Sequence, residues 1–200
     1  MKTVAVTGGI GSGKSAVTAF LSSRGIPVYD SDSRTKLLYD TDPALVPELE
    51  ALFGVPLRGK DGRLDRKKLS SIIFSDPGAL AALEAVVHPL VRSDFLSWRE
   101  RRESPLVVIE SAIILSKPLF SDLIDKVVLV DAPEEVRLQR AVSRDGADPE
   151  AVLARMRAQR FDLSRVDMII RNDGSLEDLY RSVGHAFRYL FDEDLLYLQS

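Results

Sequence analysis

The segment that most constrains the fold is residues 4–17, which read VAVTGGIGSGKSAV. A short apolar run leads into four closely spaced glycines, and a lysine, a serine and helix-forming residues follow. An apolar strand, a glycine-rich loop and a helix in this order are the first part of an α/β unit. The segment therefore predicts that a buried strand passes directly into a helix through a glycine loop.

Four further apolar runs extend this prediction to a whole sheet. The five predicted strands are residues 3–6, 26–29, 106–109, 127–130 and 168–170. They are continuously apolar, which is typical of strands buried on both faces of a parallel sheet. Helices are predicted over residues 14–24, 133–144 and 175–190. Strands and helices that alternate in this way predict a doubly wound α/β domain.

Two intervals between the strands are longer than a crossover needs. Residues 61–104 are predicted to form an inserted helical subdomain, whose long helix Pro89 should kink or interrupt. Residues 145–166 are polar and arginine-rich, and they are predicted to form a mobile lid. The expected core consists of the rest of the chain, residues 1–60, 105–144 and 167–200.

Composition excludes several classes of function. The formal net charge of -3 gives no indication of nucleic-acid binding, and the absence of cysteine excludes disulfides, thiolate catalysis and cysteine zinc sites. No apolar run approaches the ~20 residues that span a bilayer, and the first residues do not read as a signal peptide. We therefore expect a cytoplasmic protein with a small-molecule substrate and no nucleic-acid or membrane partner. Its oligomeric state, monomer or weak homo-oligomer, stays open.

The glycine loop fits the pattern G-x-x-x-x-G-K-[ST], with Gly8, Gly13, Lys14 and Ser15 at the fixed positions. Glycines let backbone N–H groups surround a phosphate chain, and the following helix presents its positive end. Lys14 is expected to reach the β- and γ-phosphates, and Ser15 to coordinate Mg²⁺. The pattern thus predicts binding of ATP with Mg²⁺. The residues expected to hold the nucleotide here are Gly9, Gly11, Ser12, Gly13, Lys14, Ser15 and Ala16.

Acidic residues follow two other strands, at the edge of a parallel sheet where ligands collect. Asp32 is a candidate to take the proton of an acceptor hydroxyl or to hold Mg²⁺ through water, and the alternative is that it caps a helix beginning near Ser33. For Asp30, a functional role and a capping role are equally open. Glu110 is a candidate to support magnesium or to contact substrate, and a capping role is equally open.

Arginines gather on one predicted helix and in the predicted lid. Arg137, Arg140 and Arg144 share one face of the helix that begins at Pro133. The segment after it adds Arg155, Arg157 and Arg160. One interpretation is an ordinary solvated surface. The other is a set of cations that closes over a phosphoryl group, stabilises its charge and excludes water.

Taken in order, these motifs resemble the dephospho-coenzyme A kinase family. The matching segments are TGGIGSGKS at 7–15, DSD at 30–32, HPLV at 88–91, ESAIIL at 110–115, RAVSRD at 140–145, RMRAQ at 155–159 and IIRNDG at 169–174. The resemblance implies a P-loop nucleoside-triphosphate hydrolase fold of the nucleoside-monophosphate-kinase type, with a five-stranded parallel sheet, a helical coenzyme A-binding insert and a lid. It implies phosphorylation of the 3′-hydroxyl of dephospho-coenzyme A by ATP, the last step of coenzyme A biosynthesis.

The resemblance also implies roles for single residues. Asp32 would be the base, and Lys14 and Arg140 would complete the catalytic set. The implied substrate-binding residues are Thr7, Asp32, His88 and Glu110; Thr7 would also serve ATP and magnesium. Arg140 and the lid arginines, with Arg144, would bind phosphates, and Asn172 and Gly174 would lie by the adenine of ATP. A basic cluster is a candidate for the anionic end of the acceptor, or a solvated helix face: Arg63, Arg66, Lys67 and Lys68.

One departure and two alternatives stand beside this resemblance. Many members of the family have an aromatic residue and a glutamate soon after the IIL segment, where this chain has Ser116 and Lys117. A kinase of another small metabolite would share the same core, although HPLV together with DSD favours the first interpretation. A nucleotide-dependent switch that reads guanine would need an Asn-Lys-x-Asp segment, which RNDG at 171–174 does not supply.

Overall fold

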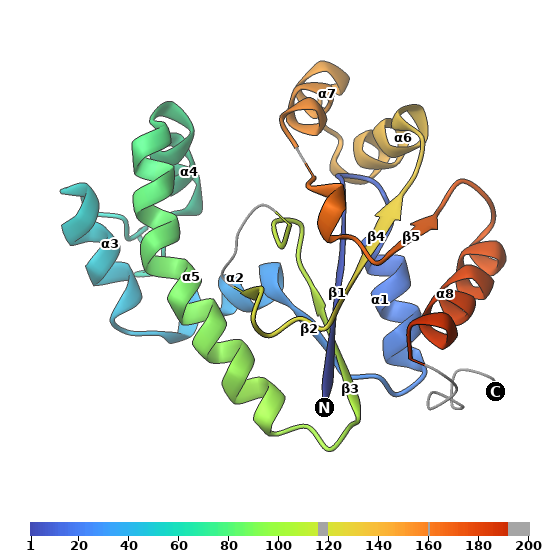
Figure 1. The fold of residues 1–200 in the computed structure, drawn as a ribbon. Helices are drawn as coiled ribbons and strands as arrows, with labels where there is room; N and C mark the ends of the chain where they lie inside the picture. Colours follow the sequence, from blue (N-terminus) through green and yellow to red (C-terminus); the bar gives the residue numbers. More distant parts are fainter. Residues whose placement is uncertain (116–119, 160, 192–200) are drawn as a thin grey trace. The chain divides into compact units, whose positions relative to one another are not determined.

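The computed structural model describes residues 1–115, 120–159 and 161–191 (Figure 1). The chain forms two compact units. The first contains residues 1–29 together with those from 102 onward, and the second contains residues 30–101. The first carries the sheet and the glycine loop, and the second is helical.

A five-stranded sheet with the strand order β2-β3-β1-β4-β5 forms the centre of the first unit. Its strands are β1 (Lys2–Gly8), β2 (Val28–Asp30), β3 (Leu106–Glu110), β4 (Lys126–Asp131) and β5 (Met168–Arg171). β1 pairs in parallel with β3 and β4, and its Val6 lies opposite Glu110. The five strands and the parallel α/β class predicted from the apolar runs are confirmed.

Two helices cover one face of this sheet. α1 (Lys14–Ser23) and α8 (Leu176–Phe191) lie side by side in Figure 1. Their Val17, Leu21, Val183 and Phe187 are fully buried with strand residues such as Val6. Each such side chain stabilises the fold by about 1.5–3 kcal/mol relative to exposure. The phosphate loop, residues 8–15, is therefore held between a central strand and a firmly packed helix.

The segment predicted as a lid contains regular structure. α7 (Pro149–Ala158) follows α6 (Glu134–Asp145), and a short 3-10 helix covers Leu163–Arg165. Val152 and Met156 of α7 are buried against Ala141 of α6, so this segment has a small apolar core of its own. Whether the segment moves during the reaction stays a prediction.

The second unit consists of α2 (Ser31–Thr41), α3 (Leu45–Phe53), α4 (Arg66–Ser75) and α5 (Pro77–Glu100). α2, α3 and α4 each pack against α5. The compact unit begins at residue 30, because packing against α5 joins α2 and α3 to it. That residues 61–104 form the functional insert stays a prediction. None of the helices in the described ranges has the length and hydropathy of a membrane span.

The helix α5 runs without interruption through Pro89, so the predicted interruption is wrong, and a kink at Pro89 stays a prediction. Pro89 and Ala85, the residue whose carbonyl loses its partner, are both exposed. Water can solvate that carbonyl, and the opposite face packs a continuous stripe. The buried residues of the stripe are Leu83, Val87, Val91, Phe95 and Trp98.

One carboxylate ties the starts of β4 and β5 together. Asp167 accepts hydrogen bonds from the Val127 N–H and from Lys126 Nζ, both at 2.8 Å. Burial raises the pKa of Asp167, but these hydrogen bonds outweigh it and leave the pKa below its ordinary value. Its stabilising contribution is therefore present above the ordinary pKa and is lost as the pH falls through the lowered one.

We expect Asp167→Ala to lower the free energy of unfolding by about 1–3 kcal/mol at pH 7, because the Val127 N–H loses its acceptor. Below about pH 4 the difference from the wild type should shrink. Urea unfolding at several pH values measures both effects. Asp173→Ala is the control, since the contact of Asp173 with Arg171 is exposed and 3.9 Å long. Equal stability of the two variants would contradict the assignment.

Candidate active site

The phosphate loop connects β1 to α1 and is held by contacts from within itself. The Ser12 N–H donates to the Gly9 carbonyl at 3.1 Å. Lys14 Nζ donates to the carbonyls of Gly8 (2.8 Å) and Gly9 (3.3 Å). No acidic side chain stands in the first turn of α1. The first turn of the helix therefore contributes no carboxylate of its own that would compete with an anion at its positive end.

Glycine is required in this loop by close neighbours as well as by backbone angles. Gly11 has a φ of 74°, and a Cβ there would lie 2.1 Å from the Arg137 carbonyl oxygen. Gly13, the N-cap of α1, has a φ of 97°, and its Cβ would lie 2.1 Å from Asn172 Nδ2. Any larger residue would push the loop away from α6 and from Asn172.

We expect Gly11→Ala to weaken ATP binding about tenfold or more, because the loop must shift to relieve the contact with Arg137. Gly25→Ala is the matched control. Gly25 has a similar φ of 79°, but its Cβ would meet nothing within 4 Å. Both variants carry about 1–2 kcal/mol of backbone strain, so strain alone does not distinguish them. Calorimetric titration with ATP measures the difference, and equal affinities would contradict this role of the contact.

The predicted residues Ser15 and Glu110 are brought together at the carboxyl ends of β1 and β3. Ser15 Oγ donates to one oxygen of the Glu110 carboxylate at 3.0 Å. Thr18 Oγ1, one turn further along α1, donates to the other at 2.5 Å. The carboxylate thus accepts from two α1 side chains. Thr18 was not predicted, although its spacing of three residues from Ser15 is a usable signal.

These oxygen atoms suit magnesium. Mg²⁺ prefers hydroxyl, carboxylate, water and phosphate oxygens, and it is usually bound through one or two carboxylates together with substrate phosphates. The described residues contain no group of three or more acidic, histidine or cysteine side chains that could hold a metal by themselves. The Ser15 hydroxyl beside the Glu110 carboxylate fits a magnesium ion that reaches the protein with a triphosphate.

Asn172 and Arg140 form a second support of the loop. Asn172 is 5% exposed, and its Nδ2 donates to the Ser12 carbonyl at 2.8 Å. Arg140 Nη1 donates to the Asn172 carbonyl at 3.0 Å, and the Asn172 N–H donates to the Asp131 backbone carbonyl at 2.7 Å. The two predicted residues therefore meet at the loop. Gly174 lies two residues further on and is exposed.

The other arginines divide into two groups. Arg137 packs against the loop: a Cβ at Gly9 would lie 2.3 Å from its Nη1, and its Nε is buried without a hydrogen-bond partner among the described residues. The sequence named Arg137 together with Arg140 as a candidate phosphate cation, with a solvated surface as the alternative, and did not predict its contact with the loop. Arg144 instead pairs with Asp145 on the surface, which raises the pKa of Arg144 and lowers that of Asp145. Arg160 lies outside the described residues.

Hydrogen bonds show which aspartate caps the N-terminus of α2. Asp30 is the N-cap, and its Oδ1 accepts from the N–H groups of Asp32 (3.0 Å) and Ser33 (3.1 Å). Asp32 is exposed in the first turn of the helix. The alternative that Asp32 caps α2 is therefore wrong, because its neighbour occupies that position.

The family model described as dephospho-CoA kinase matches residues 2–178. The chain belongs to this family. It is 46% identical to a dephospho-CoA kinase from Porphyromonas gingivalis, over 82% of this chain and 80% of that one. It is 42% identical to one from Thermus thermophilus, over 90% and 87% of the two chains. Membership of this family makes the chain a kinase.

Solved structures agree with this membership. A Thermus thermophilus structure titled TT1252 is 41% identical, covers 94% of this chain and 97% of its own, and has a TM-score of 0.82. A dephospho-CoA kinase from Campylobacter jejuni is 28% identical, covers 95% and 98%, and has a TM-score of 0.68. A shikimate kinase from Acinetobacter baumannii, with 19% identity and a TM-score of 0.55, shares the fold. The predicted P-loop kinase fold is confirmed.

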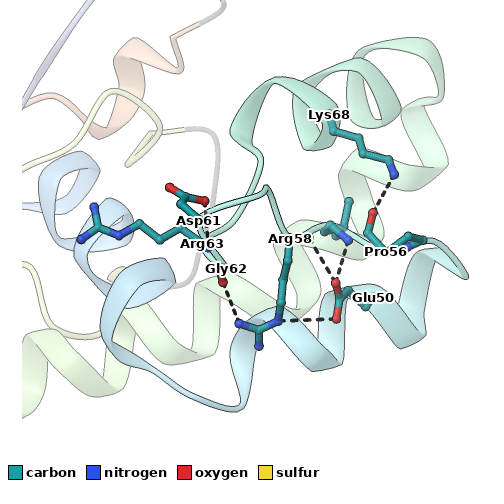
Figure 2. Close-up of polar contacts among 8 residues, drawn as sticks. Glu50, Pro56, Arg58, Asp61, Gly62, Arg63 and Lys68 are labelled. Atoms are coloured by element: carbon teal, nitrogen blue, oxygen red, sulfur yellow. Dashed lines mark hydrogen bonds and ion pairs between the residues drawn. The ribbon is translucent and has the colours of Figure 1, made fainter.

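In this dephospho-CoA kinase family member, two side chains of the predicted basic cluster bind other groups of the second unit. Lys68 Nζ donates to the Pro56 carbonyl at 2.7 Å, as Figure 2 shows. Arg66 pairs with Asp40 at 3.0 Å. The side chains of Arg63 and Lys67 have no such partner among the described residues. Of the cluster, these two remain candidates for an anionic ligand.

Four other positions singled out in the sequence lie elsewhere in the chain. His88 is half-buried on α5 in the second unit. Thr7 is fully buried on β1, and its hydroxyl has no hydrogen-bond partner among the described residues. Ser116 and Lys117, where the sequence departs from many family members, lie outside the described residues.

Proposed function

We propose that this chain transfers the γ-phosphate of ATP to the 3′-hydroxyl of dephospho-coenzyme A, giving coenzyme A and ADP in the last step of coenzyme A biosynthesis. The observation that carries the proposal is the phosphate loop with Lys14 at the start of α1, in a chain that the family model covers from residue 2 to 178. We further propose that the reaction takes place in the cytoplasm with soluble small molecules alone.

The loop supplies the triphosphate site. Its backbone N–H groups and the positive end of α1 would hold the phosphates of ATP. Lys14 Nζ lies at the Gly8 and Gly9 carbonyls, and we propose that it turns to the β- and γ-phosphates when ATP binds. Asn172 and Gly174 would border the adenine, and Arg144 would meet phosphate after leaving Asp145.

Ser15 and Glu110 would hold magnesium at the end of the loop. The hydroxyl is suited to direct coordination, and the carboxylate can act through bound water. Bound magnesium neutralises phosphate charge in transfer reactions of this kind. Thr18 would keep the Glu110 carboxylate oriented, because it donates to the oxygen that Ser15 does not use.

The acceptor chemistry would belong to Asp32. As the 3′-oxygen forms its bond to the γ-phosphorus, the bond from that phosphorus to the ADP oxygen breaks, and the hydroxyl proton passes to the Asp32 carboxylate. Arg140 would stabilise the charge on the transferred group. We propose that Thr7 and His88 contact the substrates, that the helical insert binds the coenzyme portion, and that residues 145–166 close as a lid.

The deciding experiment follows ADP release from ATP and Mg²⁺ with four acceptors. Dephospho-coenzyme A should give ADP and coenzyme A, and adenosine, AMP and shikimate should give neither ADP nor a phosphorylated product. Release of ADP with another acceptor only, from folded protein that binds ATP, would overturn the acceptor assignment and leave the phosphate loop intact.

A further inference from the structure

Ile10, at the centre of the phosphate loop, has two separate contacts with the segment 141–159. Its side chain packs on the apolar cluster formed by Ala141, Val152 and Met156. Its backbone N–H donates to Gln159 Oε1 at 2.9 Å. Gln159 lies directly after α7 and is 149 residues from Ile10 in the sequence. The end of α7 is therefore joined to the loop by a specific hydrogen bond.

A loop of this composition needs such contacts in order to stay in one conformation. Glycine loses more backbone freedom on ordering than any other residue, and Ile10 lies between Gly9 and Gly11. Lys14 holds the loop at the Gly8 and Gly9 carbonyls, and Asn172 holds it at the Ser12 carbonyl. Gln159 supplies the support between these two points.

We propose that Gln159 is a positioning residue that orders the phosphate loop for ATP by holding the Ile10 N–H. A loop that is ordered before binding loses less entropy when the triphosphate arrives, so its affinity is higher. The proposal rests on the proposed function in one respect, that the ligand of the loop is ATP. It goes beyond that function because it gives Gln159 a role of its own, which is to order the loop through the Ile10 N–H.

The chemistry of the side chain explains why an amide suits this position. Gln159 Oε1 would lie 3.3 Å from a Cβ placed on Gly9, so the acceptor oxygen lies against the loop itself. A carboxylate of the same shape would accept the same hydrogen bond, but it would add a negative charge beside the phosphates of ATP. The neutral amide supports the loop without repelling its ligand.

The test uses Gln159→Met, which removes the acceptor at similar volume, and Gln159→Glu, which keeps the acceptor but adds charge. Gln139→Met is the matched control, because Gln139 is exposed on α6. The Kd for ATP is measured by titration without acceptor, and hydrogen exchange reports the Ile10 amide. Steady-state kinetics then separate kcat from KM for each substrate.

We expect Gln159→Met to raise the Kd for ATP about fivefold, as the loss of one hydrogen bond implies, and to speed exchange at Ile10. Gln159→Glu should keep the amide protected and still raise the Kd on the order of tenfold, an effect that salt reduces. At saturating ATP the KM for dephospho-coenzyme A should be unchanged in both, and Gln139→Met should match the wild type.

Wild-type ATP affinity in Gln159→Met, or equal Ile10 protection in Gln159→Met and wild type, would overturn the proposal. A loss of ATP affinity in Gln139→Met as large as in Gln159→Met would do the same. These measurements need no acceptor. If wild-type protein bound ATP but did not phosphorylate dephospho-coenzyme A, the proposed function would fall, and the role of Gln159 would still be judged by the Kd values.

Discussion

Replacing Lys14 with alanine should lower kcat by about 10²–10³, because the developing charge on the γ-phosphate loses its cation. The same change frees the Gly8 and Gly9 carbonyls, to which Lys14 Nζ donates in the structure, so ATP binding should weaken as well. Single-turnover phosphorylation measured at saturating ATP separates the chemical step from this loss of affinity.

The control for Lys14→Ala is Lys2→Ala, which removes an exposed lysine whose ion pair with Asp125 is 3.5 Å long. Surface pairs of this kind contribute little, so this variant should keep wild-type activity and a wild-type Tm. A folded Lys14→Ala protein with an unchanged single-turnover rate would contradict the assignment of the loop.

Replacing Asp32 with asparagine should lower kcat by about 10²–10⁴ and leave the Kd for ATP close to the wild-type value. Asparagine has nearly the same shape as aspartate, but its amide cannot take the proton of the acceptor hydroxyl. The effect of Asp32→Asn on kcat can be separated from an effect on helix stability, because Asp30 and not Asp32 caps α2. The helix should therefore stay intact in the variant, which a circular dichroism spectrum checks.

Asp30→Asn is the matched control for Asp32→Asn, since it makes the same chemical change two residues away. Asparagine is about as good an N-cap as aspartate, so α2 and the turnover rate should change little. If Asp30→Asn lost as much kcat as Asp32→Asn, the effect would belong to the start of α2 in general. If Asp32→Asn kept its kcat, Asp32 would not be the base.

Most of the sheet could be predicted because its signal is local. A strand buried on both faces of a parallel sheet must be apolar at every position, and the run at residues 106–109 satisfies this by itself. The unit boundary could not be predicted in the same way. Residues 31–53 belong with the second unit because α2 and α3 pack against α5, and that packing joins residues distant in sequence.

The residues of the candidate site also differ in whether a local sequence pattern predicts them. The pattern around Lys14 was readable because consecutive residues supply the donors, the helix start and the cation. The sequence offered Arg137 only as one of several candidate phosphate cations and Gln159 only as part of the segment RMRAQ, and their contacts with the loop could not be predicted. Only the folded chain brings the Arg137 carbonyl to Gly11 and Gln159 Oε1 to the Ile10 N–H.

The sequence by itself determined the chemistry that this protein can perform: a phosphate loop, a lysine and serine at a helix start, and carboxylates after neighbouring strands. Each of these features is recognised from backbone angles, hydrogen-bond donors and charges within one short segment, although the segments lie far apart in the chain. The tertiary structure decided which side chains support that chemistry. It assigned the cap of α2 to Asp30, Glu110 to Ser15 and Thr18, and Ile10 to Gln159. Such contacts close loops of up to 149 residues, and no local pattern records them.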